Sequence, residues 1–343
     1  MPRKATKRAV GDANVDDSTK ETPASILSTA LSHEKVAEWK ETLKKEWLFA
    51  APDEFFQIHA LAVSLKPDNP SDAFVEALGL RLTGPFDALS SKPLPTPVGT
   101  SSQGQLTNML QAYIHGRSVY DPPEVLTVMQ QDDQTFGYFR DAPSDTPSLI
   151  VQGSLTAGSF AFVGTSLAGV LLGLLGASTS PTATTLRDTL ISVCGLPSPA
   201  PTTKRRKTIR STAHDAAATD HRLQHTVAST LSGLGIVVPV QAKTGMGFRH
   251  LPTTGQALRA LLAKPTRPKG VDELITRATI ACDECDFGTA LQLGLDLWSA
   301  SGKVQYDMDA LALLEGAYLM LKRGAFATLA RAHMAHCRRR REP

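Results

Sequence analysis

One segment near the middle of the chain divides it into two parts. Residues 196–221 contain three prolines and the basic run Lys204–Lys207. Proline interrupts helices and central strands because it fixes φ and lacks a backbone N–H. The segment therefore predicts a flexible linker or insertion between two folded halves, residues 31–195 and 222–337. A length of 343 residues is enough for two domains of ordinary size.

Both ends of the chain are polar and basic. Residues 1–30 are rich in charged residues, Ser and Thr without apolar periodicity, which predicts a disordered tail. Residues 338–343 hold four consecutive arginines and are predicted to be a basic tail. The net charge is only +3, so the whole molecule is not a polycation, but its basic residues are clustered. Such clusters suit nuclear import and weak nucleic-acid contact, and equally suit a solvated segment. These features leave the cytosol and the nucleus open as compartments, and the prediction for this chain is the nucleus.

Cysteines and apolar runs restrict the class of protein further. Four cysteines are too few for a secreted disulfide scaffold, and no signal peptide is visible at the N-terminus. The uncharged run 159–176 approaches the length of a membrane span. Gly, Ser and Thr interrupt it, and it lacks an aromatic belt and flanking basic clusters. We therefore expect a buried helix there and no contact with a membrane.

Hydrophobic periodicity predicts helices and then strands in the N-terminal half. Helical patterns cover residues 35–48 and begin again at Asp53. Short β-type runs separated by turn residues follow, which is typical of an antiparallel meander. They are Val125–Met129, Thr135–Phe139, Ser148–Gln152 and Ser159–Val163. Two further helices are predicted at residues 166–175 and 185–194.

The C-terminal half is predicted to be mixed and largely helical. Its β-branched run Gly235–Val240 favours a strand. Asp307 is placed to cap a helix that Gly324 ends. The expectation for the whole chain is an α+β fold with two packed halves, the first built from helices plus the antiparallel meander.

The densest group of reactive side chains lies at Cys282–Gly288, which reads Cys-Asp-Glu-Cys-Asp-Phe-Gly. Its two thiols are spaced like a redox pair or half of a zinc site. Carboxylates between the thiols would raise their pKa, which opposes redox catalysis. A zinc site would need a second pair of ligands from residues 333–337, far along the chain.

Two other interpretations concern the carboxylates of Asp283 and Glu284. Acidic residues at the start of a helix complement its dipole, so the pair would be a cap and a first-turn residue. Alternatively, one carboxylate is a general base that takes a proton from a hydroxyl nucleophile. Such a base requires a pKa raised toward neutrality, and a partner surface would have to supply the burial. The pattern alone favours the helix start.

Arg249 is the second candidate. Gly245–Gly247 predicts a turn that presents Phe248 and Arg249, and a guanidinium held there can bind a carboxylate through two hydrogen bonds. An ordinary surface ion pair is the competing interpretation. The chain carries no Walker loop, nucleophile elbow, zinc-finger spacing or dinucleotide-binding fingerprint.

Four blocks of residues share their order and spacing with a known family. The blocks are Leu78–Asp87, Tyr120–Asp141, Gly235–Pro252 and Asp283–Leu297, with Leu321-Lys322-Arg323 downstream. In these blocks, which span roughly residues 46–325, the chain resembles the histone PARylation factor family. Members of that family are accessory proteins of the DNA-damage poly(ADP-ribose) polymerases.

The resemblance implies a specific role. The chain would dock on the polymerase catalytic domain and complete a joint active site, without being an enzyme on its own. Glu284 matches the carboxylate that deprotonates the acceptor serine of histones or of the polymerase. Asp283, Phe248, Arg249 and Asp286 match partner-binding positions. NAD would be held by the partner, so no cofactor is expected on this chain, and contact with nucleic acid would be limited to the basic tails.

Two departures from the family pattern fall at the expected interface. Phe248 stands where the family usually has tyrosine, and Ile280 stands where an aromatic residue is expected. Two other classes of function remain open from the sequence. One is a nuclear scaffold that binds a partner without contributing chemistry, and the other is an independent hydrolase that uses Asp283 and Glu284.

Overall fold

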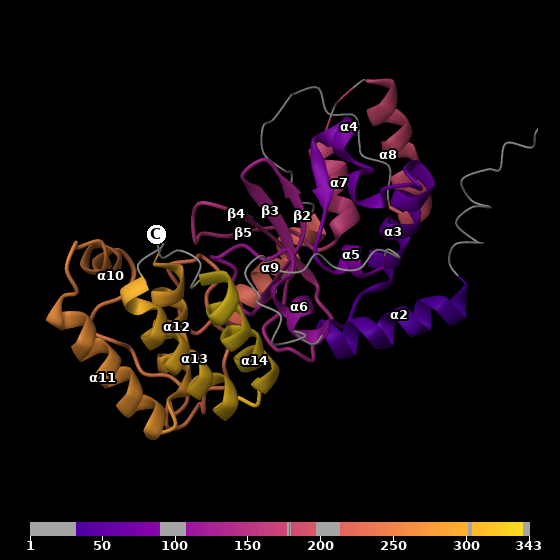
Figure 1. Ribbon diagram of the computed structural model, residues 1–343. Coiled ribbons are helices and arrows are strands. Elements are labelled where there is room, and N and C mark those ends of the chain that lie inside the picture. The colour runs from indigo at the N-terminus through magenta and orange to yellow at the C-terminus, as the bar shows by residue number, and fades with distance from the viewer. Residues whose placement is uncertain are drawn as a thin grey trace, which may run out of the picture.

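The computed structural model describes residues 32–89, 108–176, 178, 180–196, 213–300 and 304–338. Figure 1 shows an antiparallel sheet in the middle of the molecule, with one group of helices on either side of it. The predicted N-terminal tail and the loop predicted at residues 91–104 lie outside the described residues, as do all but Arg338 of the predicted C-terminal tail.

The sheet is a five-stranded meander in the order β1-β2-β3-β4-β5, with every neighbouring pair antiparallel. Its strands are β1 (Leu80–Leu82), β2 (Val125–Gln131), β3 (Gln134–Phe139), β4 (Leu149–Ser154) and β5 (Ala161–Gly164). The meander predicted from residues 125–163 is therefore confirmed. Both faces are covered, since Tyr138 packs with the N-terminal helices while Phe139 packs toward Leu234 of the second half.

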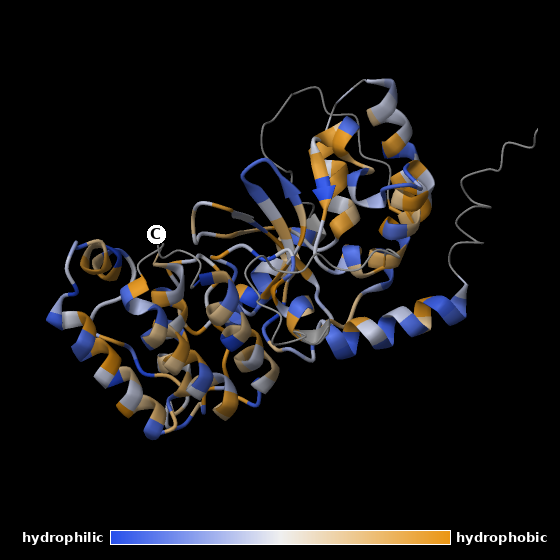
Figure 2. Ribbon diagram, in the orientation of Figure 1, coloured by the Kyte–Doolittle hydropathy of each residue, from blue (hydrophilic) through white to orange (hydrophobic). Residues whose placement is uncertain are grey.

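Helices of the N-terminal half cover one face of this sheet. They are α2 (His33–Glu46), α3 (Asp53–Leu65), η1 (Pro70–Asp72), α4 (Val75–Leu78), α5 (Pro85–Ala88), α7 (Leu167–Leu175) and α8 (Pro181–Cys194). Figure 2 shows hydrophobic residues concentrated where α3, α7 and α8 pack, whereas α2 is mostly hydrophilic. The uncharged run at 159–176 forms β5 and the largely buried α7. Within the described ranges, no helix is long and apolar enough to cross a membrane.

The C-terminal half is a helical bundle around α12. Its elements are α9 (Ala213–His225), α10 (Gly255–Leu262), α11 (Lys269–Asp283), α12 (Phe287–Ser299), η2 (Val304–Tyr306), α13 (Asp307–Met320), α14 (Gly324–His333) and the π-helix η3 (Met334–Arg338). Every residue of α12 from Gly288 to Ser299 is buried. Burial on all sides explains why its leucines alternate like a strand although the segment is a helix. Together with the sheet, this bundle confirms the predicted α+β class.

Residues 118–124, which follow α6 (Asn108–Ile114), fasten the two halves together. The Trp298 Nε1 donates to the backbone oxygen of Asp121 at 3.2 Å. The Tyr318 hydroxyl donates to Glu124 Oε1 at 2.7 Å. Burial raises the pKa of both carboxyls, Asp121 and Glu124. The Tyr-Asp-Pro-Pro-Glu block at 120–124 therefore acts as a buried joint between the halves.

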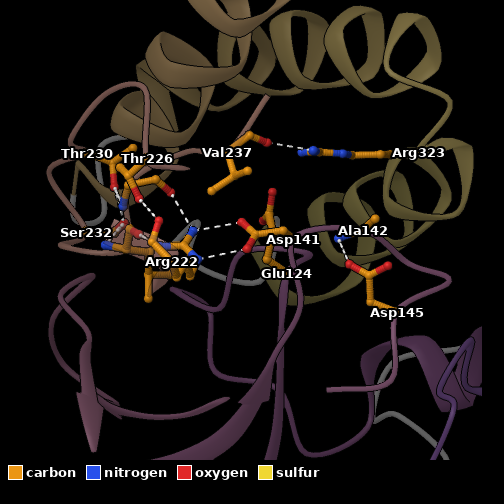
Figure 3. Close-up of polar contacts among 12 residues, drawn as sticks. Glu124, Asp141, Ala142, Asp145, Arg222, Thr226, Thr230, Ser232, Val237 and Arg323 are labelled. Carbon is orange, nitrogen blue, oxygen red and sulfur yellow. Dashed lines mark hydrogen bonds and ion pairs between the residues drawn. The ribbon is translucent and has the colours of Figure 1, made fainter. Parts of the chain in front are cut away.

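A second joint uses Arg222, and Arg323 makes a similar contact to a carbonyl oxygen within the C-terminal half (Figure 3). Arg222 of α9 donates through Nε and Nη2 to the carboxylate of Asp141 at 2.8 and 2.7 Å, and through Nη1 to the Leu234 oxygen at 2.6 Å. Arg323 donates to the Val237 oxygen at 2.7 Å. The predicted strand Gly235–Val240 is consequently wrong. This segment makes one isolated bridge, at Ile236, and guanidinium groups take carbonyl oxygens that a neighbouring strand would otherwise pair.

Four smaller expectations also differ from the structure. Residues 213–225 form α9, so the predicted linker to residue 221 includes the first two turns of a helix whose Ala-rich, polar sequence hides its periodicity. Gly324 begins α14 and does not end α13, and the N-cap of α13 is Tyr306. Asp307 instead forms an ion pair with Arg338 at 2.7 Å, which makes Arg338 a buried part of the fold and not of a basic tail.

Candidate functional site

The acidic block lies where α11 ends and α12 begins. Asp283 is the last residue of α11, Glu284 is its C-cap, and Asp286 occupies the N-cap position of α12. Cys285 between them has φ +70°, a left-handed conformation that turns the chain sharply from one helix into the next. The interpretation of Asp283 and Glu284 as the start of a helix is therefore wrong. Both lie at a C-terminus, where the helix dipole disfavours carboxylates.

The turn predicted to present Arg249 packs against this junction. Asp286 Oδ1 accepts the N–H of Gly247 at 2.8 Å, and the N–H of Gly288 donates to the Gly247 oxygen at 2.9 Å. The Thr289 hydroxyl accepts the N–H of Arg249 and donates to the Arg249 oxygen, both at 2.8 Å. The backbone on either side of Phe248 is thus held to the first turn of α12 by four hydrogen bonds.

Two glycines allow this close approach. Gly247 has φ +119°, and a Cβ there would lie 2.3 Å from the backbone oxygen of Pro239. A Cβ on Gly288 would lie 2.7 Å from Val238 Cγ2 and 2.9 Å from the Gly247 oxygen. Glycine is therefore required at 247 where the turn passes Pro239, and at 288 where the turn rests on α12.

An ion-pair cluster is the centre of the site. The Arg249 guanidinium binds Glu284 Oε2 at 2.7 Å and Asp286 Oδ2 at 2.9 Å. The side chains of Arg249 and Glu284 are 54% and 53% exposed, whereas that of Asp286 is 7% exposed. The hydrogen bond to Glu284 is the main cause of a raised pKa of Arg249, which stays a cation. Glu284 therefore lies at the surface and forms an ion pair with Arg249.

The predicted partner-binding residues differ in their exposure and in their contacts. Asp283 is exposed, and Phe248 is half-buried with its ring edge-on to His250 at 4.9 Å. Asp286 is buried, and its two oxygens are engaged by Gly247 and Arg249. The prediction that Asp286 faces the partner does not fit this burial. Asp286 supports the turn and the guanidinium from beneath.

Three exposed apolar side chains belong to the segments that form the cluster. Val240, Met246 and Ile280 are 40%, 45% and 49% exposed. Met246 pairs through its backbone oxygen with Gln241, next to Val240, and the N–H of Glu284 donates to the Ile280 oxygen at 3.0 Å. Exposed apolar side chains, methionine and arginine are enriched on surfaces that a partner covers.

The structure does not support the interpretations of Cys282 and Cys285 as a redox pair or as half of a zinc site. Burial, followed by Asp283 and Cys285, raises the pKa of Cys282, so its reactive thiolate is disfavoured. In the parts of the chain that the structure describes, no group of three or more His, Cys, Asp or Glu side chains could hold a metal ion. His333, a suggested zinc ligand, is buried against the Ser118 oxygen instead.

Sequence reasoning missed Thr289, which is fully buried and clasps both backbone groups of Arg249. Nothing in its spacing distinguishes it from an ordinary helical threonine. It also missed Gly288 as a packing requirement, although the glycine directly after Asp286-Phe287 was part of the noted block.

Comparison with known proteins identifies the family of the chain. The family described as Histone PARylation factor 1 matches residues 38–337. The chain is 31% identical over 323 residues to Histone PARylation factor 1 of Danio rerio, with 87% of this chain and 85% of that protein covered. It is 29% identical over 317 residues to Histone PARylation factor 1 of Bos taurus, with 87% and 86% covered. The chain therefore belongs to the histone PARylation factor family.

Proposed function

We propose that this chain docks on the catalytic domain of a poly(ADP-ribose) polymerase and completes a joint active site for serine ADP-ribosylation, with Glu284 as the general base. The polymerase holds NAD, this chain binds no cofactor, and the acceptor serines belong to histones and to the polymerase in the nucleus. One observation carries the proposal. The Glu284 carboxylate stands at the surface of a rigid helix junction, and its ion-pair partner is an equally exposed arginine.

The chemistry asked of Glu284 is one proton transfer. The carboxylate takes the proton of the serine hydroxyl while the oxygen attacks the ribose carbon that carries nicotinamide. The bond from that carbon to nicotinamide breaks, and nicotinamide leaves with the electron pair. Glu284 then releases its proton to solvent. A partner surface that excludes water strengthens a carboxylate as a base, because the charged form loses hydration.

Arg249 links docking to the state of Glu284. Its guanidinium has two carboxylate partners, and the one on Asp286 is fixed and buried. A carboxylate on the polymerase competes with Glu284 for the exposed side of the guanidinium. Docking then leaves Arg249 anchored by Asp286 and frees Glu284 to accept a proton.

The docking surface comprises Asp283, Phe248 and Arg249, extended by the exposed apolar side chains of Val240, Met246 and Ile280. Arginine anchors beside apolar side chains supply most of the binding energy in typical interfaces. Ile280 offers aliphatic surface at the position where an aromatic residue was expected.

The test is Glu284→Gln, measured as serine-linked ADP-ribosylation of histones with the cognate polymerase. We expect a loss of about a hundredfold or more, with docking on the catalytic domain retained. Glu38→Gln makes the same chemical change at an exposed position of α2 and should leave the rate unchanged. Serine modification by E284Q at the wild-type rate, with docking intact, would exclude the catalytic role.

Arg249→Ala tests the interface separately. Docking should be lost, because the guanidinium is the anchor, while the fold is retained by the Asp286 and Thr289 contacts to the turn. Wild-type affinity of R249A would contradict the docking assignment.

A non-catalytic scaffold is the second candidate, and the Arg249–Glu284 ion pair is the observation that favours it. In a scaffold this pair only shapes the docking surface. The E284Q variant separates the two, since a scaffold tolerates loss of the base.

A further inference from the structure

We infer that Arg323 is a positioning residue for the proposed docking surface, because it fixes residues 237–240, on which the turn at 245–249 packs. The inference rests on the proposed docking role and adds to it a buried residue that lies outside the Arg249–Glu284 pair. Arg323 is 9% exposed and occupies the N-cap position of α14. Its side chain reaches the segment through one hydrogen bond to a backbone oxygen.

Residues 237–240 have little backbone support of their own. The isolated bridge of this region ends at Ile236, and Pro239 has no N–H to donate. Within the described residues, the bond from Arg323 Nη2 to the Val237 oxygen at 2.7 Å is the only hydrogen bond made to this segment (Figure 3). Loss of that donor would leave the backbone of the segment held by packing alone.

The turn packs directly on this segment. A Cβ on Gly247 would lie 2.3 Å from the Pro239 oxygen, so the two backbones are in close contact. The N–H of Gln241, which follows the segment, donates to the Met246 oxygen at 2.8 Å. A shift of the segment therefore moves the turn, and Arg249 moves with it.

Arg323 is itself held firmly. Its N–H donates to the Tyr318 oxygen at 2.7 Å, and its oxygen accepts the Phe326 N–H at 2.9 Å. The Tyr318 hydroxyl in turn donates to Glu124 Oε1 at 2.7 Å. Glu124, Arg323 and Val237 line one narrow cavity of about 10 Å³, which has room for about one water and not for another side chain. The guanidinium therefore holds the segment from a fixed position.

The carboxyl of Glu124 adds an electrostatic attraction. Burial raises the pKa of Glu124, whereas the Tyr318 hydroxyl and the charge of Arg323 lower it. A lysine at position 323 would retain both this attraction and one donor for the Val237 oxygen. A methionine would retain only the apolar stem. The two substitutions therefore separate the polar role of Arg323 from its packing.

The first test follows amide hydrogen exchange in the full chain without a partner. In Arg323→Met, the amides of Gln241 and Gly247 should exchange at least about tenfold faster, while amides of α3 keep their rates. In Arg323→Lys, the two amides should stay within about threefold of wild type. Arg187→Ala is the matched control, because that guanidinium also donates to backbone oxygens but lies in the N-terminal half. It should leave exchange in the turn unchanged.

The second test measures serine modification by the polymerase while the concentration of each variant is raised. R323M should require at least about tenfold more protein for the half-maximal rate and reach a maximal rate within about twofold of wild type, because Glu284 is intact. R323K should recover most of the loss. A purely structural defect would not divide the effect between concentration and maximal rate in this way.

Three outcomes would overturn the inference. They are wild-type exchange and docking in R323M, equal behaviour of R323M and R323K, and a fall in the maximal rate alone. If the wild-type chain itself does not dock, the proposed function fails, and the hydrogen exchange of the free chain still decides whether Arg323 positions the turn.

Discussion

At the scale of single residues, the site depends on side chains that are themselves buried. Glu284 and Arg249 are about half exposed, and an ion pair of that kind is weak and screened by salt. Buried residues beneath the ion pair fix its geometry. Asp286 and Thr289 hold the backbone of the turn from the first turn of α12. The exposed residues supply function, and the buried ones supply position.

Thr289→Val tests this division. The substitution keeps the shape of the side chain but removes the hydroxyl that pairs with the N–H and the oxygen of Arg249. Leaving such groups unpaired costs about 1–3 kcal/mol. We expect the free energy of unfolding to fall by this amount in urea titration, together with weaker docking on the polymerase. Thr289→Ser retains the hydroxyl and should recover most of both. Equal behaviour of T289V and T289S would show that the two hydrogen bonds of the Thr289 hydroxyl have no role.

Asp296 on α12 predicts a pH dependence of stability. Burial raises its pKa to about 7, against hydrogen bonding from the Leu231 N–H and the charge of Arg259, which lower it. The folded state therefore binds a proton more tightly than the unfolded state, whose aspartate has a pKa near 3.9. This contribution to stability is complete below about pH 4 and is lost as the pH rises toward 7, by an amount on the order of a few kcal/mol.

Asp296→Asn removes the titration while keeping the oxygen that accepts the Leu231 N–H. Between pH 5 and 7.5, the difference in unfolding free energy between wild type and D296N should shift in favour of the variant as the pH rises. Comparing the two proteins cancels the other buried carboxyls and His59, whose pKa is lowered by burial to about 4. A difference that is constant with pH would contradict the assignment.

At the scale of elements, sequence patterns identified most helices and the meander, because each has one buried face and a clear period. They misplaced the acidic block, because Asp283 and Glu284 close a helix whose end is marked only by the left-handed Cys285 that follows. They also predicted a strand at 235–240. Arg222 and Arg323 donate to the carbonyl oxygens of Gly235 and Val237 there, and such long-range side-chain partners leave no local signal.

The contact between the turn and α12 predicts opposite effects for two glycines in helices. Gly288→Ala places a Cβ against Val238 and the Gly247 oxygen, so the turn must move and docking should weaken. Gly316→Ala on α13 meets nothing within 4 Å and should stabilise the chain by about 0.5–1 kcal/mol. Thermal unfolding and binding to the catalytic domain measure both. A gain in stability with normal docking in G288A would show that the close approach is unnecessary.

At the scale of the whole molecule, the halves behave as one body because buried polar groups join them. Residues 118–124 lie against Trp298, Tyr318 and His333, three side chains from three helices of the second half. The sequence showed two halves, but it offered no way to see that its Tyr-Asp-Pro-Pro-Glu block joins them. The block is one of those shared with the family, but the resemblance assigns it no structural role.

Arg338 closes this joint and provides the sharpest test of it. Its guanidinium donates to the backbone oxygens of Val119 and Trp298, pairs with Asp307, and lies 4.1 Å from the centre of the Trp298 ring. Breaking a buried ion pair costs about 3–5 kcal/mol, because the remaining charge is left without a partner. We expect Arg338→Ala to lower the unfolding free energy by about this amount and to separate the unfolding of the two halves in a denaturant titration.

Two control variants test whether the burial of Arg338 causes the loss of stability in R338A. Arg331→Ala removes an exposed ion pair with Glu315 and should change stability by no more than about 1 kcal/mol. Arg338→Lys keeps the charge but cannot reach the two oxygens and Asp307 together, so it should recover only part of the loss. If R338A costs no more than R331A, Arg338 does not stabilise the joint between the halves. A large loss confined to R338A would show instead that the first arginine of the run belongs to the joint between the halves.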